Sequence, residues 1–321
     1  MVKSGSMKSK LNIKGRHIKI LLSVLFITIL WFCIDKEKFI KAIQNVPLSL
    51  IIFSALFFAI TQTISAIKWW VLVRAAGINA SIPSCIKAFF IGMYVNTVGV
   101  GTVGGDIVRA LLIDKDGAGK GACLATVVAD RAIGLSVLAS IGLISWAAFG
   151  AVAINPKFIW VAVIVTFLAI LGFCFISKVM YFAGKLIPRF AKYFMHIADA
   201  FPKDKKVFAK VICFAAIYHC SQILLAAYII HGLGVSVPLS YIFFAVPFIN
   251  LLTTLPLSWM GLGLREGTYV SFFVPAYFST PESAMLVGSI WFVAMIIASG
   301  VGGVVAFISG DMATIRKQEK R

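Results

Sequence analysis

The sequence predicts an all-α integral membrane protein, and three observations lead to that class. Of the 321 residues, 60% are hydrophobic and only 13% are charged, whereas soluble domains carry roughly 25% charged residues. Long apolar runs recur along the chain. The 30 Lys and Arg residues outnumber the 12 Asp and Glu residues, as they do in the cytoplasmic loops of membrane proteins. Such a chain cannot cover a globular surface with polar groups, so its solvent is largely lipid.

Six apolar runs predict full transmembrane helices, because a helix needs about 20 residues to cross the hydrocarbon core. They are Ile18–Ile34, Leu48–Ile67, Gly121–Gly150, Phe158–Ser177, Val211–Ile230 and Ala284–Ser309. The first follows a basic segment but lacks a small-residue cleavage site. We therefore expect it to be a retained signal anchor.

Two further apolar stretches are interrupted and predict broken or re-entrant helical hairpins. The first joins Ile86–Val98 to Ile107–Ile113 through a glycine-rich segment. The second joins Ser240–Leu257 to Gly267–Phe278 through "SWMGLGLRE". Glycine tolerates the dihedral angles that a helix break needs. The short arms indicate that each hairpin dips into the membrane or crosses it twice.

The order span, broken hairpin, span occurs twice, which predicts an inverted repeat. Its halves cover about residues 18–150 and 158–309, linked by the basic amphipathic segment 178–210. Together they form one transmembrane domain, residues 18–309. Paired broken helices in two halves indicate a transport site near the middle of the bilayer.

The basic residues predict the orientation of the chain in a cell membrane. They concentrate in the N-terminal segment 1–17, in the segment 178–210 and in the tail 310–321. Basic segments stay on the cytoplasmic side. We therefore expect both termini to be cytoplasmic in a multi-pass protein of the inner or plasma membrane.

Several other classes of function lack support in the sequence. No basic domain of useful size lies outside the spans, so nucleic acid is not an expected partner. The six cysteines include no CxxC pair, and the four histidines have no metal-ligand spacing. Gly99, Gly101 and Gly104 fit the pattern GxGxxG, but membrane-type sequence precedes them instead of a strand. We expect neither a metal nor a cofactor.

Charged side chains inside the apolar stretches define the candidate substrate-binding site. A charge at the centre of a bilayer costs at least about 2.5–3.5 kcal/mol, so these side chains are expected to face a polar cavity. The candidate residues are Gly104, Gly105, Asp106, Arg109, Asp130, Arg131, Asn250, Ser258, Gly261, Gly263, Arg265 and Glu266. The arginines, with the N-termini of the second hairpin arms, are expected to attract an anion. The carboxylates balance the arginines or contact an amine. The alternative is that these charges form internal ion pairs that only lock helices together.

Three blocks, "GGDIVRALL", "ADRAIGLSVL" and "PLSWMGLGLREG", resemble the signature blocks of the flippase-like transmembrane family. That family includes the membrane half of the lysylphosphatidylglycerol synthase/flippase proteins. The resemblance runs from about Lys10 to Ser309. One departure from the pattern of the relatives is that the first hairpin has no proline before its glycines.

The resemblance implies a lipid translocator whose partners are membrane lipids. These are a phospholipid, an aminoacylated phospholipid or a polyprenyl-linked glycolipid, and an oligomer is possible. The soluble lysine-transferring domain of larger relatives is not expected, since the chain ends about a dozen residues after the last span.

Two alternatives stay open. One is an integral-membrane transferase, or an accessory subunit in lipid or envelope modification. Asp106 and Asp130 are available to such an enzyme, but no DxD or HExxH motif accompanies them. The other alternative is a membrane scaffold without transport.

Overall fold

In the computed structural model, the described residues are 3–99, 102–114, 119–149, 191–255 and 257–311, together with residues 164, 167, 181–183 and 185–187. The elements assigned in these residues are helices, which confirms the all-α class. They are α1 (Lys3–Cys33), α2 (Lys36–Gln44), α3 (Leu48–Ala75), α4 (Ile82–Val98), α5 (Thr102–Ile113), α6 (Lys120–Phe149), α8 (Ala191–Asp199), α9 (Lys205–Gly232), α10 (Leu239–Thr254), the 3₁₀ helix η2 (Trp259–Gly261), α11 (Leu264–Phe273) and α12 (Pro281–Ile308).

Within the described residues, four helices are long and apolar enough to cross a membrane, namely α3, α6, α9 and α12. The pair α1 and α2, bent by 104°, makes a fifth candidate if it is counted as one span. These helices match five of the six predicted spans. The remaining one, Phe158–Ser177, lies outside the described residues except for positions 164 and 167, and most of the tail 310–321 also lies outside them.

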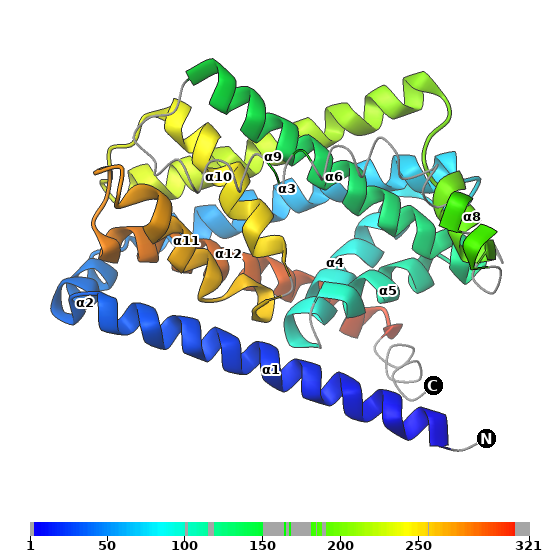
Figure 1. The fold of residues 1–321 in the computed structure, drawn as a ribbon, viewed down its shortest axis with the longest axis horizontal. Coiled ribbons are helices and arrows are strands. Elements are labelled where there is room, and N and C mark those ends of the chain that lie inside the picture. Colours follow the sequence, from blue (N-terminus) through cyan, green and yellow to red (C-terminus); the bar gives the residue numbers. More distant parts are fainter. Residues whose placement is uncertain are drawn as a thin grey trace.

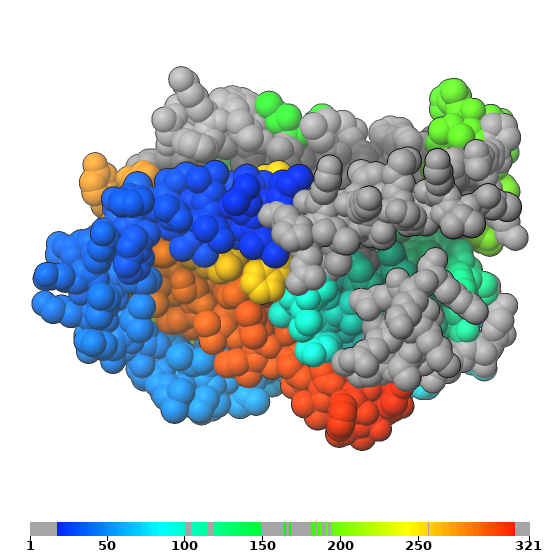
Figure 2. All heavy atoms as spheres, turned by 90° about the horizontal axis from the view of Figure 1, so that it is seen from below, coloured from blue at the N-terminus to red at the C-terminus, as the bar shows by residue number. Residues whose placement is uncertain are grey.

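The bend between α1 and α2 is fixed by hydrogen bonds at Asp35. The Asp35 carboxylate accepts from the backbone N–H groups of Glu37 and Lys38 and thereby caps α2. The backbone N–H of Asp35 donates to Oε1 of Glu282, 3.0 Å away at the start of α12. The bend is therefore attached to the helical bundle. Residues 18–33 of α1 lie on the surface beside η2 and α11 (Figure 2).

The two interrupted stretches form helical hairpins whose arms are too short to cross a bilayer. In the first, α4 has 17 residues and α5 has 12. In the second, α10 has 16 residues and α11 has 10. Figure 1 shows the two hairpins extending from opposite ends of the molecule toward its middle.

The first break is shorter than the sequence suggested. Helix α5 begins at Thr102, so Gly104 and Gly105 belong to a regular helix instead of the break. Gly105 has a packing role, because a Cβ atom there would lie 1.8 Å from the carbonyl oxygen of Gly92 on α4. Gly105 thus allows the two arms to touch.

The second break does contain unusual backbone, as its glycines predicted. Met260, Gly261 and Gly263 have φ angles of 54°, 83° and 79°, in the region that glycine adopts most readily. Helix α11 then begins at Leu264, earlier than the predicted arm at Gly267. Gly263 also lies against α1, since a Cβ atom there would be 2.7 Å from Cβ of Phe26.

The described part of the basic segment 178–210 does not form one continuous helix. Its described part contains the short helix α8, and α9 already begins at Lys205. The last residues of the segment therefore continue directly into a long apolar helix.

The helix contacts repeat when the two halves are exchanged. Helix α3 packs against α9, and the pairing of α4 with α12 corresponds to the pairing of α10 with α6. The contact of α5 with α6 likewise corresponds to that of α11 with α12. The contact of α3 with α12 corresponds to that of α9 with α6. This pattern agrees with an internal repeat in which α3 to α6 correspond to α9 to α12.

Candidate functional site

A cavity of about 420 Å³ lies where the two hairpins meet. Its wall includes residues of α3, α4, α5, α6, α9, α10, α11 and α12, and Lys19 of α1. Polar and apolar side chains share the lining, for example Gln62 and Asn250 with Leu138 and Met295. The cavity is therefore amphipathic and surrounded by the helices of both halves.

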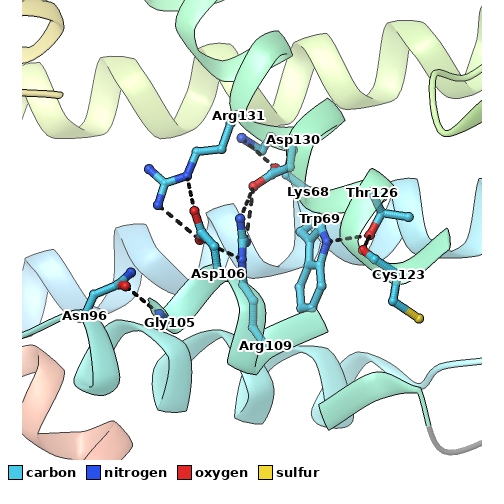
Figure 3. Close-up of polar contacts among 10 residues, drawn as sticks. All are labelled: Lys68, Trp69, Asn96, Gly105, Asp106, Arg109, Cys123, Thr126, Asp130 and Arg131. Atoms are coloured by element: carbon cyan, nitrogen blue, oxygen red, sulfur yellow. Dashed lines mark hydrogen bonds and ion pairs between the residues drawn. The ribbon is translucent and has the colours of Figure 1, made fainter. Parts of the chain in front are cut away.

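One wall of the cavity is a network of five charged side chains from α3, α5 and α6 (Figure 3). The Asp130 carboxylate lies 3.0 Å from Nζ of Lys68 and 3.2 Å from Nη2 of Arg109. The Asp106 carboxylate lies 3.1 Å from Nε of Arg109 and 3.1 Å from Nε of Arg131. Each carboxylate thus contacts two cations. Lys68, Arg109 and Asp130 are buried, where unpaired charge is costly.

Helix geometry explains these pairings. Asp106 and Arg109 are three residues apart and share one face of α5, as predicted. Asp130 and Arg131 are adjacent in sequence, but their side chains reach different partners. Arg131 binds both oxygens of Asp106 through Nε and Nη2, with both distances 3.1 Å. Its side chain is 45% exposed, and Arg131 lines the cavity.

Arg109 also packs between aromatic rings. Its guanidinium carbon lies 4.8 Å from the ring centroid of Trp69 and 5.0 Å from that of Phe89. The indole N–H of Trp69 donates to Oγ1 of Thr126 at 3.1 Å, which orients the ring. Cation–π contacts of this kind are stabilising.

Lys68 was missed as a site residue by reasoning from the sequence. It lies in the last third of α3. In the structure its side chain is 3% exposed, and its ion-pair partner is the Asp130 carboxylate. The available signal was its position inside the apolar stretch "TISAIKWWVL", where no acidic residue is near the lysine along the chain.

Arg265 has a different environment. Its guanidinium donates to Oδ1 of Asn250 at 3.2 Å and lies 3.6 Å from the ring centroid of Trp291. Among the described residues, no carboxylate lies within 4.0 Å of it. Arg265 is 6% exposed, and its buried Nε has no hydrogen-bond partner among the described residues. It is a buried cation that no carboxylate of the described residues neutralises by direct contact.

Glu266 does not balance Arg265 in the cavity, contrary to the expectation from the sequence. Its Oε2 accepts from the backbone N–H of Gly263 at 2.7 Å and so caps α11. It packs against α12, where a Cβ on Gly288 would lie 3.1 Å from Cα of Glu266. A carboxylate is favourable at a helix N-terminus. The Glu266 carboxylate thus occupies a backbone N–H group at the start of α11, where we expected an anion to bind. In α5, the N–H of Gly105 is likewise occupied, by Asn96 Oδ1 at 2.7 Å.

Of the candidate residues, eight line the cavity: Asp106, Arg109, Asp130, Arg131, Asn250, Ser258, Gly261 and Arg265. The other four, Gly104, Gly105, Gly263 and Glu266, are not in its lining. Polar lining residues that the sequence did not suggest are Lys19, Gln62, Ser65, Lys68, Asn96, Tyr218, Gln222, Thr253 and Thr254. In the described part of the chain, no group of three or more His, Cys, Asp or Glu side chains is placed to hold a metal ion.

The fold and the cavity define a class: a helical multi-pass membrane protein with an amphipathic cavity between two broken hairpins. The family model for the lysylphosphatidylglycerol synthase TM region matches residues 17–303. The chain therefore belongs to that family. It is also 29% identical, over 119 residues, to a UPF0104 membrane protein from Pyrococcus horikoshii. That alignment covers 36% of this chain and 36% of the relative, so the chain spans about a third of the length of that relative.

Proposed function

We propose that this protein is a flippase that moves a lipid between the leaflets of the inner membrane. The single observation that carries the proposal is the cavity shared by the tips of both broken hairpins. Buried charge and irregular backbone at membrane depth are tolerated where they line a cavity. In transporters, broken helices from two repeated halves form the substrate site in this way.

The lining suits a lipid headgroup. Polar and charged side chains on one part of the wall replace water around the headgroup, while Phe58, Leu138 and Met295 provide an apolar part. The acyl chains stay in the surrounding hydrocarbon during the passage. The sequence has no nucleotide-binding motif in a suitable context, so we propose passive or ion-coupled transport.

The proposed orientation places both termini on the cytoplasmic side. The start of α1, the end of α12 and α8 lie at one end of the molecule, and α2 lies at the opposite end (Figure 1). The end that holds the start of α1, the end of α12 and α8 is next to the three basic segments. The positive-inside rule favours the cytoplasmic side for such segments. On this orientation each hairpin is re-entrant, and the two enter from opposite sides.

Cysteine labelling tests the orientation. In a cysteine-free background, an impermeant maleimide added outside intact cells should label Ser236→Cys, in the exposed turn after α9, but not Lys203→Cys before it. Labelling of both after lysis is the control. Labelling of Lys203→Cys in intact cells would overturn the orientation.

Translocation is tested with purified protein in unilamellar vesicles that carry a fluorescent phospholipid. A membrane-impermeant quencher should reach more of the label in protein-containing vesicles than in empty ones. Mass spectrometry of the extracted lipid distinguishes the transferase alternative, since an enzyme of lipid modification yields a new lipid species. Unchanged leaflet distribution with every lipid class tested would overturn the proposed function.

A further inference from the structure

We propose that the headgroup accepted by the cavity carries two or more negative charges, as a phosphomonoester or a diphosphate does. Zwitterionic headgroups, and cationic aminoacylated headgroups such as lysylphosphatidylglycerol, are disfavoured. This inference rests on the proposed function and specifies its substrate class. It is based on the charges, aromatic rings and unpartnered donors of the cavity.

The first argument is the charge of the lining. Five of its side chains are cationic: Lys19, Lys68, Arg109, Arg131 and Arg265. Its carboxylates are Asp106 and Asp130. The described lining therefore has three more positive than negative charges. In a surrounding of low dielectric constant, such an excess favours a multiply charged anion.

The second argument is that no lining carboxylate is available for an ammonium group. Asp130 already contacts Lys68 and Arg109, and Asp106 contacts Arg109 and Arg131. An ammonium headgroup would have to share a carboxylate with two protein cations, which would repel it. Glu266, the other carboxylate near the second hairpin, caps α11 and does not line the cavity.

The third argument concerns aromatic rings, the other common binding partners of an ammonium group. Among the described lining residues, three rings already contact protein cations. Trp291 lies against Arg265 at 3.6 Å, Phe89 against Arg109 at 5.0 Å, and Tyr218 has Nζ of Lys68 at 5.7 Å. The fourth ring of the described lining, Phe58, packs edge-on against Trp291 with 4.9 Å between the ring centroids. A single ring without a protein cation does not form an aromatic cage for a choline or a lysyl group.

The fourth argument is that donors suited to phosphate oxygens are unused. Nε of Arg265 and Oγ of Ser258 are both buried without a hydrogen-bond partner among the described residues, and both residues line the cavity. Lys19 likewise has no carboxylate within 4.0 Å in the described part of the chain. Charge-assisted bonds to phosphate oxygens from such donors are about twice as strong as neutral ones.

Binding to the purified full-length protein in a non-ionic detergent tests the inference by titration calorimetry. The ligands are dihexanoyl phosphatidic acid, dihexanoyl phosphatidylcholine, dihexanoyl lysylphosphatidylglycerol and inorganic pyrophosphate. Phosphatidic acid should bind at least roughly tenfold more tightly than phosphatidylcholine or lysylphosphatidylglycerol, because one charge-assisted hydrogen bond accounts for about that factor. Pyrophosphate should bind more weakly than phosphatidic acid, since it lacks the acyl chains.

Two variants link this preference to the cavity. Arg265→Gln should weaken phosphatidic acid binding roughly tenfold, and Lys19→Gln should weaken it by a smaller factor. The matched control Lys41→Gln, which removes the same charge from the exposed face of α2, should leave the affinity unchanged. Full affinity in both cavity variants would overturn the assignment. Lys19→Gln keeps the test decisive if Arg265→Gln does not fold.

The remaining outcomes are also decisive. Equal or tighter binding of lysylphosphatidylglycerol would overturn the proposed substrate class, even if vesicles show translocation. Equal affinity for pyrophosphate and phosphatidic acid would assign the site to a soluble anion and overturn the lipid headgroup. Selective binding of phosphatidic acid without translocation of any lipid would support the substrate class and overturn the flippase function.

Discussion

In the first hairpin, α4–α5, the arginine is enclosed by opposite charge, and Arg109 contacts both Asp106 and Asp130. In the second hairpin, α10–α11, Arg265 contacts an amide and an indole ring but, among the described residues, no carboxylate. The two hairpins occupy corresponding places in the repeated helix packing, and both reach the same cavity. They therefore differ in how their charge is compensated.

This difference in charge compensation predicts that the arginines of the two hairpins matter for folding to different degrees. Removing one partner of a buried ion pair leaves an uncompensated charge and costs about 3–5 kcal/mol. The first hairpin should therefore be required for folding. Removing an arginine that has no carboxylate partner leaves no orphaned charge, so the second hairpin can lose Arg265 and keep its fold. The four predictions below test this separation, from the largest expected effect to the smallest.

The largest effect is expected for Asp130→Ala. The substitution leaves Lys68 and Arg109 buried without that carboxylate. We expect a loss of about 3–5 kcal/mol in the free energy of unfolding, measured by thermal or denaturant unfolding in detergent. The matched control is Asp199→Ala, since Asp199 pairs with Lys203 on the surface with both side chains exposed. There the loss should be below about 1 kcal/mol.

The double variant Lys68→Met/Asp130→Ala sharpens this prediction. It removes one of the two orphaned cations and should recover part of the lost stability. Equal stability of Asp130→Ala and Asp199→Ala would show that the network is not structural, and the contrast between the hairpins would fail.

The second prediction concerns Arg265. Arg265→Ala should reduce translocation in vesicles by more than about tenfold, because the guanidinium is the unneutralised donor of the cavity. Arg265→Lys should reduce it less, since a lysine keeps the charge and loses the planar donor fork. Both variants should stay monodisperse in detergent. Arg74→Ala, an exposed arginine near the end of α3, is the control and should transport normally.

An aggregating Arg265→Ala protein would indicate that Arg265 stabilises the fold as Arg109 does. A fully active one would show that the guanidinium does not contact the transported lipid. Either result would remove the distinction between the hairpins.

The third prediction compares adjacent glycines in the first hairpin. A Cβ on Gly105 would lie 1.8 Å from the carbonyl oxygen of Gly92, whereas a Cβ on Gly104 would meet nothing within 4 Å. Gly105→Ala should therefore destabilise the protein by about 1–3 kcal/mol through overpacking. Gly104→Ala should be neutral or stabilising by up to about 1 kcal/mol, because alanine is the better helix former. Unfolding in detergent measures both, and equal effects would contradict the close contact of α4 with α5.

The helices and the charged segments of this fold could be predicted from the sequence because both depend on local composition. A run of apolar residues at membrane length predicts a helix wherever it packs. The break before Arg265 was also predictable, because Gly261 and Gly263 have positive φ angles that the sequence signalled directly. Helix ends depend on contacts between helices, so the start of α5 at Thr102 was not predictable.

The partners of the charged residues could not be predicted, because they come from distant parts of the chain. Lys68 pairs with Asp130, 62 positions later in the sequence, across the contact of α3 with α6. Glu266 was assigned to the cavity, but its Oε2 accepts the capping hydrogen bond from the backbone N–H of Gly263. The spacing of these two residues fits a helix cap equally well. Three-dimensional packing decided between the two roles.

The smallest effect is expected at Ser23 of α1, which holds the second hairpin from outside. The backbone N–H of Trp259, in the break, donates to Oγ of Ser23 at 2.7 Å. The break of the second hairpin thus depends on a helix that is not part of either repeat, whereas the first hairpin is held by its own close contact at Gly105. Ser23→Ala removes one hydrogen bond and should cost about 1 kcal/mol. Amide hydrogen exchange should then become faster at residues 257–262 and stay unchanged at residues 92–98 of α4.

Ser289→Ala is the control, because the Ser289 hydroxyl donates within its own helix, to the carbonyl of Met285. Faster exchange in both hairpins would show that α1 stabilises the whole bundle. Unchanged exchange in both would show that the second break is self-supporting, like the first.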